Sequence, residues 1–170
     1  MAIVAIEALG KHDRTAFSCG VAALDEWFRQ RAGQDDKRNF ARVFVAIDDT
    51  FGVAGFYSLS TFTLSIDELP PAHARKLPRY DRIPAALIGR LARDVRLADR
   101  GLGDLLLADA VRRIVAASKI LAVHAIVVEA KDERAATFYR DFGFQSFPSR
   151  PMRLFLPLAD AAAAIEAAES

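Results

Sequence analysis

A glycine turn in the second half of the chain has the composition of an anion seat. Arg100-Gly101-Leu102-Gly103 separates an apolar run from residues with helical apolar spacing, which predicts a tight turn at the start of a helix. Amides in the first turn of a helix have no acceptor within the helix, and the helix dipole favours negative charge there. The turn could therefore seat a pyrophosphate, although a glycine pair before a helix is often only a turn. It is neither a G-x-G-x-x-G nucleotide fingerprint, because position 106 is Leu, nor a Walker loop.

A tyrosine further along the chain could act as a general acid. Asp132 can cap a helix that carries Phe138, Tyr139 and Phe142 at helical spacing, and Gly143 predicts its end. A free tyrosine has a pKa of roughly 10, so Tyr139 would hold its proton at neutral pH and could donate it to a leaving group. The alternative interpretation is a packed helix aromatic beside Phe138 and Phe142.

The formal net charge of +1 conceals two basic segments. Eight basic and three acidic residues lie between Arg75 and Arg100, and five basic and two acidic residues lie between Arg29 and Arg42. These segments could face an anionic partner, such as coenzyme phosphates or RNA. The alternative interpretation is solvated charge on loops and helix faces.

The remaining pattern predicts an α/β scaffold that positions these groups. Strands are expected at Ile3–Ala8, Arg42–Ile47, Phe51–Ser65, Ala85–Val95, Ala125–Glu129 and Met152–Leu156. Helices are expected after the Ser18-Cys19-Gly20 turn, after Gly103 and after Asp132, and a proline-rich loop with one possible helical turn is expected at 67–84. We predict one domain over 1–158, followed by an Ala-rich acidic tail, 159–170, that could form a helix.

Several classes of protein and site are disfavoured. The single cysteine, Cys19, gives no internal disulfide, and His12, His73 and His124 are too widely spaced to predict a metal site. No apolar run reaches membrane-spanning length, and the N-terminus lacks the basic leader of a signal peptide. We therefore expect a cytoplasmic protein without a membrane partner.

Together, the glycine turn and the tyrosine helix resemble the GNAT acetyltransferase superfamily. That family has a coenzyme-A loop of the form Gln/Arg-x-x-Gly-x-Gly/Ala, then a strand and a helix with Ala-x-x-Phe-Tyr and Gly-Phe. The match runs from about Ile88 to Phe144, with Ala98 at the position of the leading Gln/Arg and Asp132 at that of a frequent Asn. The resemblance implies an α/β GNAT fold: a mixed, mostly antiparallel sheet splayed between the fourth and fifth strands and flanked by helices.

More of the chain resembles the GNAT toxins of type II toxin–antitoxin modules. The matching segments are His12-Asp13…Phe17-Ser18-Cys19-Gly20…Ala23-Leu24-Asp25-Glu26-Trp27-Phe28, Gly55-Phe-Tyr-Ser-Leu, Ile83-Pro84…Ile88-Gly89-Arg90-Leu91-Ala92 and Pro151-Met152…Leu154. This resemblance implies an acetyl-CoA-dependent enzyme without a metal, which acetylates the α-amino group of aminoacyl-tRNA and blocks translation. It also implies a homodimer and a ribbon-helix-helix antitoxin.

The resemblance assigns a role to each candidate residue. Tyr139 is the expected catalytic acid. The expected acetyl-CoA contacts are Leu91, Ala92, Arg93, Arg96, Arg100, Gly101, Leu102, Gly103, Asp104, Asp132 and Phe138. The expected RNA contacts are Lys37, Arg38, Arg75, Lys76, Arg79, Arg82 and Arg90.

Two alternatives remain open from the sequence. The chain could be a GNAT enzyme for a protein N-terminus or a small-molecule amine, such as a polyamine or a drug. It could also be a coenzyme-A-binding partner protein without catalytic activity.

Overall fold

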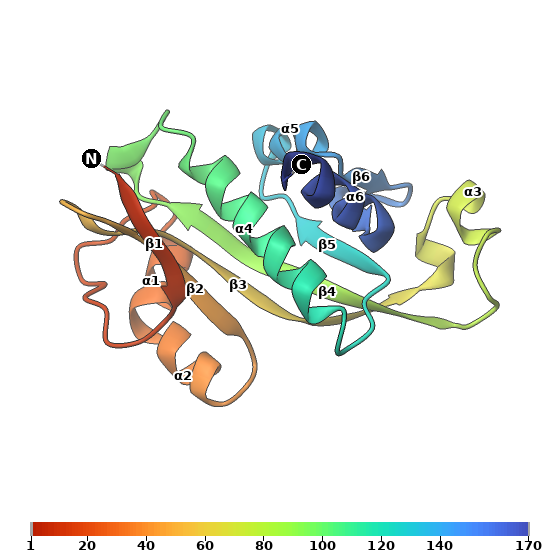
Figure 1. The fold of residues 1–170 in the computed structure, drawn as a ribbon, viewed down its shortest axis with the longest axis horizontal. Coiled ribbons are helices and arrows are strands. Elements are labelled where there is room, and N and C mark those ends of the chain that lie inside the picture. Colours follow the sequence, from red (N-terminus) through yellow and green to blue (C-terminus); the bar gives the residue numbers. More distant parts are fainter. Residues whose placement is uncertain (1, 170) are drawn as a thin grey trace. The chain divides into compact units, whose positions relative to one another are not determined.

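The strands join into one sheet in a computed structural model that describes residues 2–169. Within these residues the sheet has seven strands in the order β1-β2-β3-β4-β5-β7-β6 (Figure 1). The strands are β1 (Ile3–Ala8), β2 (Arg42–Asp48), β3 (Gly52–Ser65), β4 (Arg82–Arg93), β5 (Ala125–Glu129), β6 (Gln145–Phe147) and β7 (Arg150–Pro157). The predicted α/β class with a mixed, mostly antiparallel sheet is confirmed, and β4 and β5 form a parallel pair.

Five helices lie between strands along the described chain, and a sixth follows the last strand. They are α1 (Ala22–Gln30), α2 (Ala32–Lys37), α3 (Pro71–Ala74), α4 (Leu102–Ala117), α5 (Glu133–Phe142) and α6 (Leu158–Glu169), with 3-10 turns η1 (Ile66–Glu68) and η2 (Val95–Leu97). No helix of the described chain is long and apolar enough to cross a membrane. The residues of the Ala-rich tail within the described range belong to α6, in agreement with the prediction of a helix.

The chain divides into two compact units. One contains the chain up to Ser60 together with Gly89–Ala110, and the other contains Thr61–Ile88 together with the chain from Val111. Strands β3 and β4 and helix α4 each contribute to both units.

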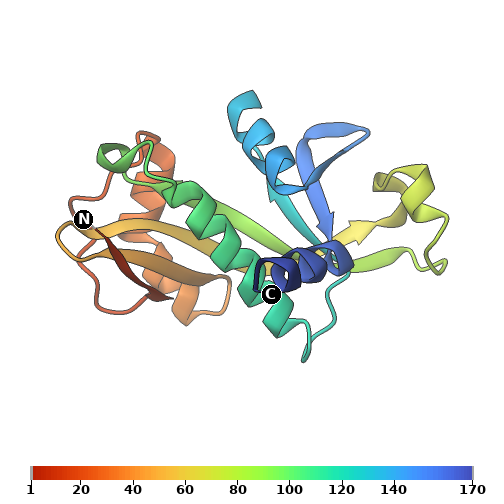
Figure 2. The same ribbon diagram turned by 45° about the horizontal axis from the view of Figure 1, so that its top comes forward.

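The first unit is organised by the side-chain alternation of β2 and β3. Phe56 stacks on Phe28 of α1, with ring centroids 4.0 Å apart, and Trp27 packs beside it. The next residue, Tyr57, points to the other face and donates a hydrogen bond from its hydroxyl to Asp109 of α4 at 2.5 Å. Figure 2 shows α1 and α2 lying along β2 and β3, where they cover this aromatic core.

The second unit is organised around β5, whose first four residues are buried. Ala85–Ile88 of β4 pair in parallel with Ala125–Val128, and β7 pairs with the other edge of β5 in antiparallel register. Val127, Phe147 and Phe155 lie in the core of this unit. The apolar Ala125–Glu129 run therefore forms a central strand, as predicted.

Three details of the predicted elements differ from the structure. Strand β4 begins at Arg82, inside the expected proline-rich loop, and ends at Arg93 because Asp94 caps η2. The short elements α2 and β6 were not predicted. Both are shorter than the windows over which apolar periodicity can be recognised.

Candidate functional site

Helix α5 places Tyr139 in an apolar environment. The Asp132 side chain accepts a hydrogen bond from the Ala135 amide at 2.8 Å, which fixes the start of the helix as predicted. The Tyr139 side chain is buried, its ring packs against Phe138 and Phe144, and burial raises its pKa to about 12. Tyr139 therefore keeps its proton throughout the physiological pH range.

The hydroxyl of Tyr139 is available to another molecule. The hydroxyl has no hydrogen-bond partner among residues 2–169, and Tyr139 as a whole is only 8% exposed. A buried hydroxyl usually has a partner in a folded protein. The arrangement therefore suits a group that donates its proton to a bound substrate.

The glycine turn forms the predicted start of α4. Asp99 and Gly101 have φ angles of 64° and 69°, and the space beside Gly101 is open, since a Cβ there would meet no atom within 4 Å. The Leu105 amide bonds to the Gly101 carbonyl at 3.1 Å. The amides of residues 102–104 therefore precede the first helical hydrogen bond and have no acceptor within the helix, as an anion seat requires.

A cavity of about 260 Å³ adjoins this turn in the first unit. The residues that line it come from the glycine turn, the first turn of α4, η2 and the ends of β1 and β2: Ala2, Ile3, Asp48, Leu97, Arg100, Leu102 and Leu105. Arg100 is the cationic member of this set and one of the residues that we expected to contact the coenzyme.

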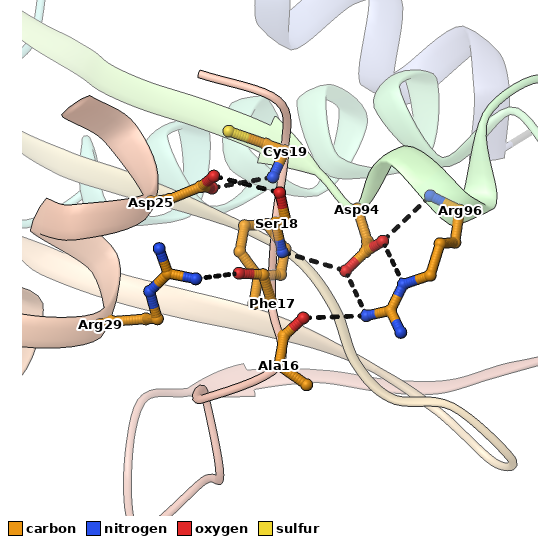
Figure 3. Close-up of polar contacts among 8 residues, drawn as sticks. All are labelled: Ala16, Phe17, Ser18, Cys19, Asp25, Arg29, Asp94 and Arg96. Carbon is orange, nitrogen blue, oxygen red and sulfur yellow. Dashed lines mark hydrogen bonds and ion pairs between the residues drawn. The ribbon is translucent and has the colours of Figure 1, made fainter. Parts of the chain in front are cut away.

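Between β4 and this turn, a network of polar contacts joins Asp94 and Arg96 to the segment Ala16–Ser18 (Figure 3). The Asp94 carboxylate accepts hydrogen bonds from Nε and Nη2 of Arg96, both at 2.9 Å, and from the Ser18 amide at 3.2 Å. Burial opposes ionisation of Asp94, but the hydrogen bonds from Arg96 and Ser18 outweigh it and hold the pKa of this carboxyl below its usual value. The Arg96 guanidinium, which we expected to contact the coenzyme directly, is thus bound within the protein.

Arg90 is also bound within the first unit. Its Cζ lies 3.9 Å from the centroid of the Trp27 ring, and the Trp27 indole donates a hydrogen bond to Asp35 at 2.9 Å. Burial lowers the pKa of Arg90, an effect that nearby Asp35 opposes. One face of the guanidinium therefore stacks on Trp27 and is not exposed. From the sequence we expected Arg90 to contact RNA.

The other predicted RNA contacts are exposed and fall into two groups. Lys37 and Arg38 lie at the end of α2 in the first unit. The second unit carries the larger group, Arg75, Lys76, Arg79 and Arg82, which follows α3 in the sequence as far as the first residue of β4 and includes the exposed Tyr80 between Arg79 and Arg82. We call this larger group the α3 basic cluster.

A cavity of about 320 Å³ in the second unit, at the end of β5, was not predicted from the sequence. Arg153, which lines the cavity, forms ion pairs with Glu129 at 2.6 Å and with Glu68 at 3.1 Å. The lining residues are Glu129, Ala130, Arg150, Pro151, Met152 and Arg153. The only indication in the sequence was the Pro151-Met152 segment, which carries no chemical motif of its own.

Two histidines that are distant in the sequence meet in the second unit. Nε2 of His73 and Nε2 of His124 lie 3.0 Å apart. The pKa of His124 is lowered mainly by burial and to a lesser extent by the charge of nearby His73. No group of three or more metal-ligating side chains occurs within the described residues. The two imidazoles share a hydrogen bond that joins α3 to the residue before β5.

The chain is similar to known proteins over most of its length. The chain is 35% identical over 157 residues to a probable toxin TacT of Sinorhizobium fredii, covering 88% of this chain and 87% of the relative. It is 37% identical over 153 residues to a tRNA-acetylating toxin of Mycobacterium tuberculosis, covering 90% of each. No known family profile matches the chain.

Solved structures of similar proteins cover nearly the whole chain. A tyrosine-to-phenylalanine variant of KacT has a TM-score of 0.89 and 26% identity and covers 96% of this chain and 99% of its own. AtaT complexed with acetyl-methionyl-tRNAfMet has a TM-score of 0.86 and 29% identity, with 98% and 99% covered. A tyrosine-to-phenylalanine variant of AtaT, bound to the C-terminus of the antitoxin AtaR and to acetyl-CoA, has a TM-score of 0.80 and 26% identity, with 95% and 97% covered.

Sequence identity above 30% over most of both chains, with the same fold, establishes the relationship. The chain belongs to the family of GNAT acetyltransferase toxins that includes TacT and the tRNA-acetylating toxin of M. tuberculosis.

Proposed function

We propose that this protein is an acetyl-CoA-dependent N-acetyltransferase toxin that acetylates the α-amino group of aminoacyl-tRNA and so blocks translation. The observation that carries the proposal is its close relationship to a tRNA-acetylating toxin, combined with an unpaired, proton-holding Tyr139 on α5. A similar protein, AtaT, has been captured with an acetylated aminoacyl-tRNA.

In the proposed reaction the acceptor nitrogen attacks the thioester directly. A new N–C bond forms, the C–S bond breaks, and the coenzyme leaves as a thiolate. The nitrogen, which becomes positively charged on attack, loses one proton to solvent, and after Tyr139 has protonated the thiolate the tyrosine regains a proton from solvent. Free α-amines titrate at roughly 7.7–8.0, so a substantial fraction of the acceptor is neutral near pH 7.5 without a dedicated base. No covalent enzyme intermediate is required.

Tyr139 supplies the proton that the departing thiolate takes up. A phenol with a pKa of about 12 is a weak acid, so donation requires a strongly basic acceptor. A thiolate that forms in the same dry environment is more basic than in water, because desolvation disfavours its charge as well. The burial of Tyr139 thus suits donation to the coenzyme and prevents loss of its proton to water.

The coenzyme would be held mainly by backbone groups. The amides of Leu102, Gly103 and Asp104, which follow Gly101, bind the pyrophosphate, with Arg100 as a nearby cation. The backbone of Leu91–Arg93 at the end of β4 bonds to the pantetheine arm and polarises the thioester carbonyl. We expect Asp132 and Phe138 of the tyrosine helix to contact the coenzyme as well.

The acceptor tRNA would be bound by the exposed cations. The α3 basic cluster offers the largest group, and Lys37 with Arg38 offers a second. Phosphate contacts of this kind position RNA without reading its sequence. We propose a smaller part for Arg90, because its guanidinium already stacks on Trp27.

The proposed function implies partners and a location. AtaT binds the C-terminus of its antitoxin AtaR, and we propose that this chain is neutralised by an antitoxin with a ribbon-helix-helix DNA-binding domain. We also propose that it acts as a homodimer in the cytoplasm, where charged tRNA is found.

The test is transfer of labelled acetyl from acetyl-CoA to total tRNA charged with amino acids. We expect label on the aminoacyl group of charged tRNA and none on uncharged tRNA. Free amino acids, spermidine and a peptide with a free N-terminus serve as competing acceptors. Label on spermidine or the peptide but not on charged tRNA would replace the tRNA assignment with a small-amine or protein acceptor. Coenzyme binding without transfer to any amine would remove the enzymatic assignment.

A further inference from the structure

The carboxylate of Asp94 is a fully buried charge at the point where β4 ends. Its two oxygens together accept four hydrogen bonds: from the amides of Ser18 and Arg96, and from Nε and Nη2 of Arg96 (Figure 3). Its own amide donates to the Ala54 carbonyl of β3 at 2.8 Å. Asp94 therefore links the last residue of β4 to a neighbouring strand and to a distant segment of the chain.

The Arg96 side chain completes the same linkage. Its Nη2 donates a second hydrogen bond, to the Ala16 carbonyl at 2.9 Å, and its guanidinium lies 4.2 Å from the centroid of the Phe51 ring. The amide of Val95, between Asp94 and Arg96, donates to the Ser18 carbonyl at 2.9 Å. Asp94, Val95 and Arg96, which follow β4, are thus held in place by contacts of both their backbone and their side chains.

A second carboxylate holds the segment Ala16–Cys19 from its other side. Asp25 of α1 accepts from the Cys19 amide at 2.8 Å and from the Ser18 hydroxyl at 3.2 Å, and Arg29 donates to the Phe17 carbonyl at 2.8 Å (Figure 3). Asp25 and Asp94 are both buried and both bind an amide of this segment. They differ in that Asp94 is ion-paired with Arg96, and in that only Asp94 is continuous with the strand that we assign to the coenzyme.

A buried ion pair often adds little to the stability of a fold, because apolar residues of similar volume often stabilise it as well or better. A polar network whose members are all satisfied does, however, fix one geometry. Catalysis depends on such geometry, since a displacement of about 1 Å can reduce a rate by about 10²-fold. An oxyanion donor must likewise lie within about 2.7–3.1 Å of the developing charge.

We propose that Asp94, with Arg96 as its partner, is a positioning residue that sets the backbone of Leu91–Arg93 for the thioester of acetyl-CoA. This inference rests on the proposed function, since it assigns the coenzyme to that strand. In this proposal Arg96 does not contact the coenzyme phosphates directly. Its positive charge is paired with the Asp94 carboxylate instead. Neither side chain touches the reacting atoms.

Asp94→Asn is the principal variant, because it keeps the size and one acceptor oxygen and removes the charge. Asp25→Asn is the matched control, a buried carboxylate that binds the same segment but does not adjoin β4. We expect both variants to lower the melting temperature. Only Asp94→Asn should reduce kcat/KM for acetyl-CoA, by about 10²-fold at a temperature where both variants are folded. Its affinity for coenzyme A, measured by titration calorimetry, should fall in parallel.

Arg96→Lys and Arg96→Gln keep the proposal testable if Asp94→Asn does not fold, since half of the Arg96 side chain is exposed. Lys retains the charge, so it should restore part of the kcat/KM that Gln loses. Equal losses of kcat/KM for Asp94→Asn and Asp25→Asn, or wild-type values for Asp94→Asn and Arg96→Gln, would overturn the positioning role. A wild-type protein that binds no coenzyme A would instead overturn the proposed function itself.

Discussion

Tyr139 and Phe144 lie edge to face, with ring centroids 5.7 Å apart and an interplanar angle of 62°. The contact arises from the end of α5: Gly143 adopts a φ of 126°, and the Phe144 amide returns to the Tyr139 carbonyl at 3.1 Å. The chain reversal at this glycine places the phenylalanine ring over the tyrosine. The short sequence Tyr-x-x-x-Gly-Phe therefore builds the apolar surroundings that keep Tyr139 protonated.

Removal of the Tyr139 hydroxyl tests its role as the acid. Tyr139→Phe keeps the ring that packs against Phe138 and Phe144, so we expect the variant to fold and to bind coenzyme A as the wild type does. Acetyl transfer to charged tRNA should fall by about 10² to 10⁴-fold, the range typical of general acids. Phe142→Leu, a change on the same helix, is the control. Undiminished turnover of Tyr139→Phe would assign the proton to another donor.

The pH dependence of the reaction tests the same residue in another way. The pKa of Tyr139 is raised to about 12, so the phenol stays protonated over the whole range in which the acceptor amine titrates. The rate should rise with pH through roughly 7.7–8.0 as the amine loses its proton, and then remain level to at least about pH 10.

The stability of the fold should also depend on pH through Tyr139, because the folded state binds the Tyr139 proton more tightly than the unfolded state does. This contribution is complete below about pH 10 and is lost as pH rises towards 12.

A fall in the rate between pH 8 and pH 10 would contradict the raised pKa of Tyr139, provided that circular dichroism shows the fold intact. If this fall persists in Tyr139→Phe, it belongs to the acceptor or to another residue. If it disappears in Tyr139→Phe, Tyr139 is still the acid but titrates well below pH 12.

The local parts of the site could be predicted from the sequence. Asp132, Tyr139 and Gly143 lie within one helix and its caps, and the turn at Gly101 depends on its own backbone conformation. Each is a short-range pattern whose geometry follows from neighbouring residues. The order of the main strands and helices was predictable for the same reason.

The partners of the charged residues could not be predicted. Arg96 meets the Ala16 carbonyl 80 positions away, and His73 meets His124 across 51 positions. Arg90 likewise contacts Trp27, a residue on a distant helix. No periodicity in one sequence encodes such pairings, because they depend on how the sheet brings separate segments together. A basic residue in a basic segment therefore gave no indication of whether it is exposed or bound within the fold.

The salt dependence of tRNA binding tests the α3 basic cluster. Replacement of Arg75, Lys76 and Arg79 by Gln removes three exposed cations without disturbing a described ion pair. We expect weaker tRNA binding, and a plot of log affinity against log salt whose slope becomes shallower by about 2 to 3. A second variant, with Lys37 and Arg38 replaced by Gln, reports separately on the second group, and its slope should become shallower by a smaller amount because fewer cations are removed. An unchanged slope in the triple variant would remove the cluster from the RNA interface.

Gly55 tests the packing between β3, β4 and α4 in the first unit. A Cβ at this position would lie 2.9 Å from Cδ1 of Leu106 and 3.0 Å from the Ala92 carbonyl oxygen. The leucine can rotate away, but the carbonyl belongs to the backbone of β4 and can move only with the strand. Gly55→Ala should therefore reduce the free energy of unfolding by about 1–3 kcal/mol, the usual cost of overpacking, as measured by urea denaturation.

Gly33→Ala is the control for this substitution. Gly33 lies in α2, where a Cβ would make only an ordinary contact of 3.5 Å with Arg14, so the helix-forming preference of Ala should leave stability equal or higher. Since Ala92 belongs to the strand end assigned to acetyl-CoA, Gly55→Ala should also lower kcat/KM for acetyl-CoA at temperatures where the variant is folded. A variant as stable and as active as the wild type would show that β4 adjusts freely at this point, and the close approach of Gly55 would then have no part in fixing the strand.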